Sequence, residues 1–232
     1  GAGVCIAGEC CLSQSILVET KGMLFDMDGV LISSIGSVMR CWKRWAKMYG
    51  VPDAVNYEVP HGMRAIEIVR SLRPDIDPEE GLRAIEDMEL EDTEGLTVLP
   101  GVKELLENLP PERWLIVTSA TRKLLLGRLT VAGLPIPARL ISGDDVVHGK
   151  PDPEPYRRGA ELLGFRPEEC VVVEDAPSGV GAGVAAGCRV LGVLGTHSAR
   201  ELREADWVAS SLEGLAVTPK SDGLELRFRS VK

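Results

Sequence analysis

Short apolar runs alternate with amphipathic stretches along most of the chain. The runs show no polar alternation, as in strands buried on both faces of a parallel sheet, and they cover 23–26, 115–118, 139–142, 171–174 and 190–193. Apolar residues at helical spacing lie between them, over 101–108, 122–132, 153–163 and 178–186. Strands and helices in this order predict an α/β fold, with a doubly wound, Rossmann-like parallel sheet.

A long segment separates the first two predicted strands, and it exceeds what a single crossover needs. It begins with one helical stripe of apolar residues, at Val38, Cys41, Trp42, Trp45, Met48 and Tyr49. Helical patterns continue over 65–72 and 79–90. We therefore expect an inserted helical cap domain over 36–98, closed by a hinge at 99–101. The core domain would then consist of 22–35 and 99–232.

The two ends of the chain show other patterns. The sequences LAVTP and LELRF alternate on both sides of the turn KSDG, which predicts a C-terminal β-hairpin packed on the sheet edge. Residues 1–21 form a head rich in small residues, with Cys5, Cys10 and Cys11, and the sequence does not indicate its role. A metal or redox role for these cysteines is disfavoured, because neither a nearby His nor a CxxC motif accompanies them.

Composition narrows the class of protein. Of the 232 residues, 44% are hydrophobic and 26% are charged, and no apolar stretch reaches the roughly 18 residues of a membrane span. The net charge of −9 argues against a nucleic-acid surface, because phosphate contacts need clustered Lys and Arg. The cysteines do not suggest a disulfide framework, and Cys170 and Cys188 should be buried free thiols. We expect a cytoplasmic monomer or weak dimer with no membrane or nucleic-acid partner.

Polar residues that can carry chemistry stand where the predicted strands end. They are Asp26 and Asp28 after the first strand, Thr118 and Ser119 after the second, Lys150 after the third, and Glu174 and Asp175 after the fourth. The carboxyl ends of neighbouring parallel strands meet at the same edge of a sheet. We therefore expect four carboxylates, a lysine and a hydroxyl to gather there.

Four carboxylates held this close repel one another. For a separation of about 5 Å and an effective dielectric of about 20, each pair costs roughly 3 kcal/mol. A divalent cation and a lysine would neutralise them, and oxygen ligands with room for water and a phosphate oxygen favour Mg²⁺. The sequence therefore predicts a magnesium pocket with space for a phosphate group.

Four segments, FDMDGVL, IVTSA, GKPDPEPY and VVVEDAPSG, resemble in order and spacing the four motifs of the haloacid dehalogenase superfamily. The likeness is to its phosphatase branch with a helical cap inserted after the first motif, and it extends over nearly the whole chain from Gly22. The resemblance implies a Mg²⁺-dependent phosphomonoester hydrolase that works through an aspartyl-phosphate intermediate.

The resemblance also implies a role for each residue of the motifs. Asp26 would be the nucleophile, Asp28 the general acid and base, and Lys150 would neutralise developing charge. The phosphoryl oxygens would be held by Thr118, Ser119 and Ala120. The Mg²⁺ ligands would be Asp26, the Asp28 carbonyl, Glu174 and Asp175.

In this superfamily the cap selects the substrate. The segments HGMRAIEIVRSL, ERW and KPDPEPYRRG resemble small-polyol and sugar phosphatases of the β-phosphoglucomutase-like branch, which act on glycerol 3-phosphate or 2-deoxyglucose 6-phosphate. His61, Gly62 and Arg64 would then contact a small phosphorylated substrate from the cap. A plainer interpretation stays open for two of these residues: His61 could be an ordinary loop histidine, and Arg64 a solvated helix arginine. We expect His148 to be a loop residue.

Three other functions stay open. A sugar-phosphate mutase is the first, although Val38 stands where such mutases carry a histidine. A NAD(P)-binding oxidoreductase is the second, because GVGAGVAAG follows a strand. The preceding acids would repel a pyrophosphate, however, and the glycines more simply allow a helix to pack closely on the sheet. A pure binding protein is the third, and it would leave the acids and the lysine without a use.

Overall fold

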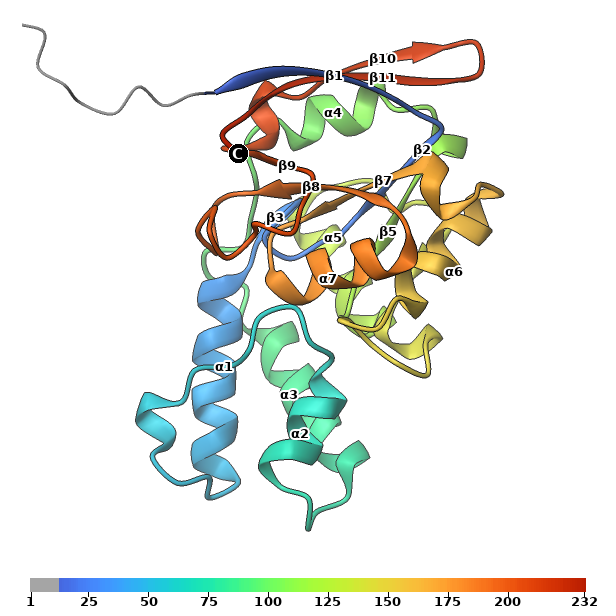
Figure 1. Ribbon diagram of the computed structural model, residues 1–232. Helices are drawn as coiled ribbons and strands as arrows, with labels where there is room; N and C mark the ends of the chain where they lie inside the picture. Colours follow the sequence, from blue (N-terminus) through green and yellow to red (C-terminus); the bar gives the residue numbers. More distant parts are fainter. Residues whose placement is uncertain (1–12) are drawn as a thin grey trace, which may run out of the picture.

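The computed structural model describes residues 13–232 of the chain. Figure 1 shows a central α/β core, with a lobe of helices at one end and a small antiparallel sheet at the opposite end. Cys5, Cys10 and Cys11, for which we disfavoured a metal or redox role, lie outside the described residues.

Parallel strands form the central six-stranded sheet, in the order β6-β5-β2-β7-β8-β9. Their bounds are β2 Gly22–Phe25, β5 Trp114–Val117, β6 Leu140–Ile141, β7 Cys170–Glu174, β8 Arg189–Val193 and β9 Trp207–Ala209. Every residue of β2, β5 and β7 is buried, which explains why their sequences are apolar up to the final Glu174 of β7. The predicted parallel sheet is confirmed, and β9 is a strand that the sequence pattern did not predict.

Helices cover both faces of this sheet (Figure 1). Their bounds are α4 Val102–Asn108, α5 Arg122–Ala132, α6 Glu154–Leu163 and α7 Pro177–Ala186. Side chains of β2 pack on both faces of the sheet. Met23 and Phe25 belong to the apolar cluster that includes α4 and α5, and Leu24 belongs to the cluster that includes α6 and α7. The predicted doubly wound α/β fold is confirmed.

The glycines of α7 allow the helix to pack closely on the sheet. A Cβ added at Gly183 would lie 2.8 Å from Val190 Cγ2 and 3.2 Å from Val172 Cγ1, closer than side chains normally approach. This contact favours the packing interpretation of GVGAGVAAG over a dinucleotide fingerprint.

An insertion of helices separates β2 from β5. It lies between two short strands that pair antiparallel, β3 Ile32–Ser33 and β4 Thr97–Val98. Its helices are α1 Ile35–Met48, α2 Ala65–Leu72 and α3 Pro78–Glu91. They enclose a separate apolar cluster around Trp42 and Trp45, and the Trp45 Nε1–H donates to the Gly81 carbonyl at 2.9 Å. The insertion therefore has its own core. A short 3₁₀ helix of the insertion is Ala54–Asn56, and those of the core are Pro111–Arg113, Gly143–Asp145, Pro167–Glu169 and Leu212–Gly214.

The C-terminal hairpin is present as predicted, with strands β10 Ala216–Lys220 and β11 Gly223–Ser230. Its main partner is β1 Gln14–Thr20, which pairs antiparallel with β11 and completes a separate three-stranded sheet. Strand β1 belongs to the head, for which no strand was predicted. The hairpin also reaches the edge of the central sheet, because the Val231 N–H donates to the Val208 carbonyl of β9 at 2.8 Å.

The described cysteines, Cys41, Cys170 and Cys188, are buried free thiols. Burial raises the pKa of Cys170 and Cys188 to about 12, so both are protonated at neutral pH. The expectation for these two residues is confirmed.

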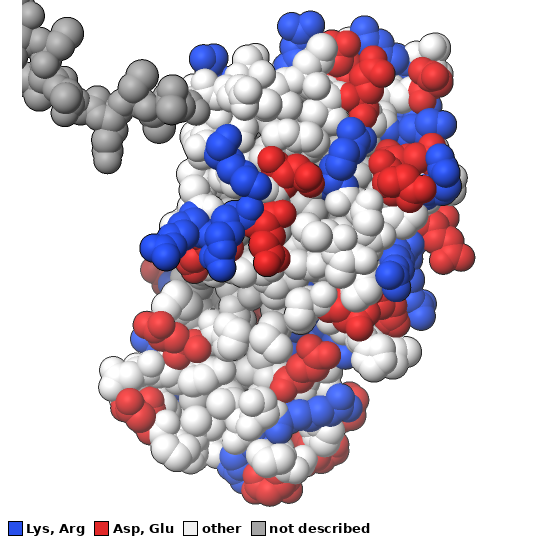
Figure 2. All heavy atoms as spheres, viewed as in Figure 1, with Lys and Arg blue, Asp and Glu red and all other residues white. Residues whose placement is uncertain are grey.

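Acidic and basic side chains are interspersed on the face of the molecule shown in Figure 2. Within residues 13–232, no helix combines the length and the apolar character that crossing a membrane requires.

Candidate active site

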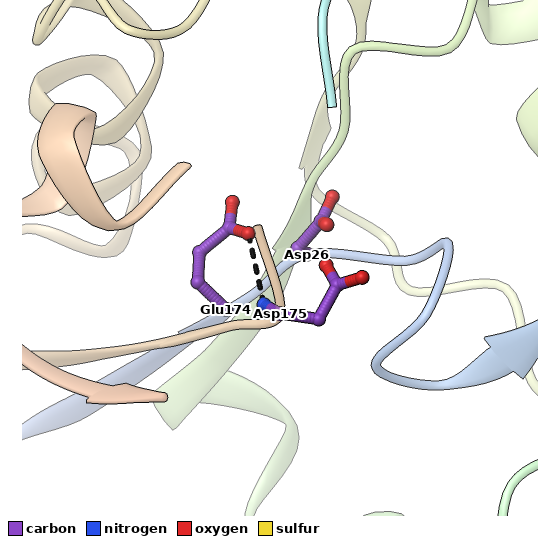
Figure 3. A group of neighbouring side chains, drawn as sticks. All are labelled: Asp26, Glu174 and Asp175. Atoms are coloured by element: carbon purple, nitrogen blue, oxygen red, sulfur yellow. Dashed lines mark hydrogen bonds between the residues drawn. The ribbon is translucent and has the colours of Figure 1, made fainter. Parts of the chain in front are cut away.

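Three buried carboxylates meet at the carboxyl ends of two adjacent strands in the middle of the sheet. Asp26 follows β2, and Glu174 and Asp175 lie at the end of β7, which pairs with β2. One oxygen of each carboxylate lies within 4.8 Å of the others. Figure 3 shows the three side chains next to one another above the strand ends. The parallel topology therefore brings together acids that are far apart in the sequence.

Lys150 lies against these acids. Its Nζ donates to Asp26 Oδ1 at 3.1 Å, to Glu174 Oε1 at 2.7 Å and to the Val117 carbonyl at 3.0 Å, and its side chain is only 1% exposed. Burial alone would lower the pKa of Lys150, but the charges of Asp26 and Glu174 outweigh it and raise the pKa. The lysine is therefore a permanent cation at this site. The Tyr156 hydroxyl also donates to Glu174 Oε1.

One lysine does not offset the charge of three buried carboxylates. Burial raises the pKa of Asp26; Lys150 opposes the increase, and Asp175 adds to it. Burial also raises the pKa of Glu174, with Asp26 adding to the increase and Lys150 opposing it. A further positive charge at this place would stabilise the ionised acids.

The acids fit a divalent cation. Asp175 Oδ1 is buried and has no hydrogen-bond partner among residues 13–232, a condition that typically costs about 1–3 kcal/mol. Two glycines make room for the carboxylates: a Cβ at Gly29 would lie 2.0 Å from Asp175 Oδ2, and one at Gly179 would lie 1.9 Å from Glu174. Hard oxygen donors with excess negative charge are the ligands that suit Mg²⁺.

The side chain of Asp28 stands beside this group rather than within it. Its Oδ1 accepts a hydrogen bond from Ser34 Oγ at 2.6 Å, and its Oδ2 accepts one from Arg128 Nη1 at 2.7 Å. Asp28 and Asp26 both line the same cavity. The side chain of Asp28 is thus held at the cavity wall, and a metal contact through its carbonyl stays a prediction.

The loop that links β5 to α5 faces the same cavity. Thr118, Ser119 and Ala120 all line it. The Ala120 N–H donates to Thr118 Oγ1 at 3.1 Å, which fixes the hydroxyl beside the end of β5. The loop therefore places the residues predicted to hold phosphoryl oxygens next to the acids.

The insertion reaches the acids through the loop before α2. His61 Nε2 lies 2.8 Å from Asp175 Oδ2, and the Gly62 carbonyl accepts a hydrogen bond from Ser119 Oγ at 2.7 Å. Burial alone would lower the pKa of His61, but the hydrogen bond and charge of Asp175 outweigh it and raise the pKa to about 9. His61 and Gly62 both line the cavity.

Arg64 does not join them. Its guanidinium donates to the carbonyls of Val146 at 2.9 Å and Val147 at 3.0 Å, and to Glu67 at 2.8 Å. The side chain also packs on Gly149, where an added Cβ would lie 2.7 Å from Arg64 Nε. Arg64 is not among the residues that line the cavity, because its terminal nitrogens are engaged by Glu67 and by the loop that leads to Lys150. His148 is exposed in that loop, as predicted.

A cavity of about 70 Å³ separates the insertion from the core. Asp26, Asp28 and the loop after β5 form its core side. Val38, Trp42 and Ile68 provide an apolar wall from the insertion, and Glu86 and Glu89 of α3 provide acidic groups. The cavity is therefore a small cleft that the core lines with Asp26, Asp28 and the loop after β5, and that the insertion lines with apolar and acidic side chains.

Sequence reasoning missed several residues that support or line the site: Tyr156, Arg128, Glu86, Glu89, Thr196 and His197. The sequence did indicate an unusual role for Arg128, because this charged residue stands beside Leu125 and Leu129 on the buried face of α5. A charged residue at a buried helical position needs a buried partner. Thr196, whose Oγ1 donates to Asp175 Oδ2 at 2.6 Å, lies in a loop after β8 and carried no such signal.

The chain is similar to several known proteins. The haloacid dehalogenase-like hydrolase family model matches residues 20–187. Hexitol phosphatase A of Escherichia coli K12 is 40% identical over 211 residues, which cover 89% of this chain and 98% of that protein. Glycerol-1-phosphate phosphohydrolase 2 of Saccharomyces cerevisiae is 32% identical over 233 residues, with 93% of each chain covered. The crystal structure of a hydrolase from Pseudomonas syringae has a TM-score of 0.75 at 26% identity, covering 83% of this chain and 94% of that one.

Proposed function

The chain belongs to the haloacid dehalogenase-like hydrolases and is a phosphatase, and from that premise we propose that it hydrolyses small sugar or polyol phosphates with Mg²⁺ through an aspartyl-phosphate at Asp26. The family resemblance drawn from the four motifs is confirmed. The observation that carries the proposed mechanism is the placement of Asp26: buried, bound to Lys150 at 3.1 Å and grouped with Glu174 and Asp175. The names of the relatives, which refer to hexitol and glycerol phosphates, support the substrate class.

We assign the metal to the acids at the strand ends. Asp26, Glu174 and Asp175 would hold Mg²⁺, together with the Asp28 carbonyl. The bound ion would shield the negative charge of the phosphate, so that an anionic carboxylate can approach phosphorus.

Asp26 and Asp28 then divide the chemistry between them. In the first step an Asp26 oxygen bonds to phosphorus, the ester P–O bond breaks, and Asp28 gives a proton to the leaving oxygen. In the second step Asp28 takes a proton from water, whose oxygen bonds to phosphorus while the bond to Asp26 breaks. Inorganic phosphate leaves, and both aspartates return to their starting state.

The groups around Asp26 bind and orient the phosphoryl group. Thr118, Ser119 and Ala120 hold its oxygens from the loop after β5, and Lys150 offsets the charge that develops on them. His61 and Gly62 approach from the insertion, which we assign to a cap domain over 36–98 that shields the reaction from water. The core domain comprises 22–35 and 99–232.

Removing the metal should abolish turnover. Dialysis against EDTA is expected to slow phosphate release from p-nitrophenyl phosphate by more than about 100-fold, because the acids alone repel the phosphate. Added Mg²⁺ should restore the rate. Ca²⁺ should not, because it takes more ligands at longer distances. A metal-free enzyme that keeps its full rate would contradict the proposal.

A further inference from the structure

Two acidic residues of the insertion extend the negative charge of the cavity beyond the catalytic aspartates. Glu86 and Glu89 lie three positions apart on α3, so their side chains share one face of the helix. Both line the cavity together with Thr121, the residue before α5, and Arg128 of α5. Their hydrogen bonds run to one another and to Asp28 but not to Asp26, and we call these four residues the distal end of the cavity.

Hydrogen bonds fix the distal end. Arg128 donates from Nη1 to Asp28 Oδ2 at 2.7 Å and from Nη2 to Glu89 Oε2 at 2.9 Å. The Thr121 hydroxyl donates to Glu86 Oε2. The side chains of Arg128 and Glu89 are only 4% and 7% exposed. The acids of the distal end are therefore held in place, and Glu89 is almost fully buried.

Arg128 does not make the distal end attractive to an anion. Its two terminal nitrogens already donate to Asp28 and Glu89, so one cation stands between two carboxylates. Lys123 Nζ lies 3.8 Å from Glu86 Oε1, but its side chain is 64% exposed and contributes little through solvent. Glu86 therefore leaves the distal end with excess negative charge.

The titration of Glu89 is consistent with crowded carboxylates. Burial raises its pKa to about 7; Arg128 opposes the increase, and Asp28 and Glu86 add to it. At pH 8 Glu89 is thus mainly ionised, and the distal end offers hydrogen-bond acceptors.

We propose that Glu86 and Glu89 make the enzyme select monophosphates of uncharged polyols and reject compounds that carry a second phosphate. The proposal rests on the proposed function, since it concerns the part of the substrate that points away from Asp26. Polyol hydroxyls donate hydrogen bonds, which carboxylates accept, whereas a phosphate dianion has no proton to donate and is repelled. The apolar wall formed by Val38, Trp42 and Ile68 suits the C–H groups of the carbon chain.

The acidic residues of the distal end also bear on whether the enzyme is a hydrolase or a sugar-phosphate mutase. A sugar-phosphate mutase that passes through a bisphosphate must hold a second phosphate at the end of the cavity away from its nucleophile. The distal end places Glu86 and Glu89 there instead of an unpaired cation. The acidic distal end therefore favours the hydrolase over the mutase.

The test is a matched pair of compounds that differ only in the second phosphate. Glucitol 6-phosphate and glucitol 1,6-bisphosphate are compared at pH 8 with Mg²⁺, and the ratio of their kcat/KM values is measured. The wild-type enzyme should favour the monophosphate by more than about tenfold. Glu86→Gln and Glu89→Gln, each of which removes one charge, should each lower this ratio by about tenfold.

Asp87→Asn is the matched control. This substitution also removes one negative charge from α3, but the Asp87 side chain is 67% exposed. Its ratio should equal that of the wild type. The inference is overturned if wild type takes both compounds equally, or if both Gln variants keep the wild-type ratio. Two substitutions at separate positions guard against one that fails to fold. No phosphate release by wild type from either compound or from p-nitrophenyl phosphate would instead end the proposed function.

Discussion

Replacing Asp26 by Asn should lower kcat for phosphate release by about 10⁴-fold or more, while leaving the fold intact. An amide is a poor nucleophile, so the first covalent step would stop. The Asn oxygen can still accept the hydrogen bond that Asp26 Oδ1 takes from Lys150 at 3.1 Å. The substitution also removes the repulsion between the Asp26 carboxylate and its acidic neighbours Asp175 and Asp28. The loss should therefore lie in chemistry and not in stability.

The measurement compares kcat and KM for p-nitrophenyl phosphate with the melting temperature of each variant. Asp222→Asn serves as the matched control, because Asp222 is exposed in the hairpin turn far from the cavity. It should keep the wild-type kcat. If Asp26→Asn retained more than about one hundredth of the wild-type kcat, Asp26 would not be the nucleophile.

Of the substitutions proposed here, Lys150→Met should lower the free energy of unfolding the most. Lys150 Nζ donates to Asp26, Glu174 and the Val117 carbonyl, and its removal leaves two buried carboxylates without their cation. Breaking a buried ion pair by removing one partner typically lowers the free energy of unfolding by about 3–5 kcal/mol. Urea unfolding in EDTA, followed by both circular dichroism and tryptophan fluorescence, would measure this loss.

The loss should also grow with pH. Asp26 already has a raised pKa of about 7 in the folded chain, against about 4 for an ordinary Asp, and loss of Lys150 raises it further. An acid with a raised folded-state pKa lowers the free energy of unfolding as the pH rises from its ordinary pKa to the raised one. For Asp26 this window runs from about pH 4 to about pH 7 in the wild type, and it extends above pH 7 in the variant. Lys21→Met is the control, since Lys21 is 50% exposed beside Glu169 and should contribute at most about 1 kcal/mol. Equal losses in the two variants would contradict the role of Lys150.

The central strands could be predicted because each is buried on both faces and therefore has no alternating polar residues, as in β2 and β5. Strand β9 is too short for a pattern, and β1 is half exposed and pairs with a segment at the other end of the chain. Local sequence does not reveal such long-range antiparallel pairing.

The acids of the candidate site could be predicted because the carboxyl ends of parallel strands share one edge. The contacts of the insertion could not, since they depend on how its helices sit against the core. Arg64, a candidate for substrate contact, donates to Val146 and Val147 and does not line the cavity. Arg128 of α5 joins Asp28 of the core to Glu89 on α3 of the insertion. The sequence of either helix alone does not indicate this link.

The most direct measurement looks for phosphate on Asp26 during turnover. Asp28→Asn would be mixed with p-nitrophenyl phosphate, because nitrophenolate leaves without needing a proton and the missing base slows attack by water. After acid quenching, borohydride reduces an acyl phosphate to an alcohol, which mass spectrometry detects as homoserine at position 26. We expect homoserine at that position alone. Phosphate release without homoserine at position 26, or with reduction at another carboxylate, would show that a different group attacks phosphorus.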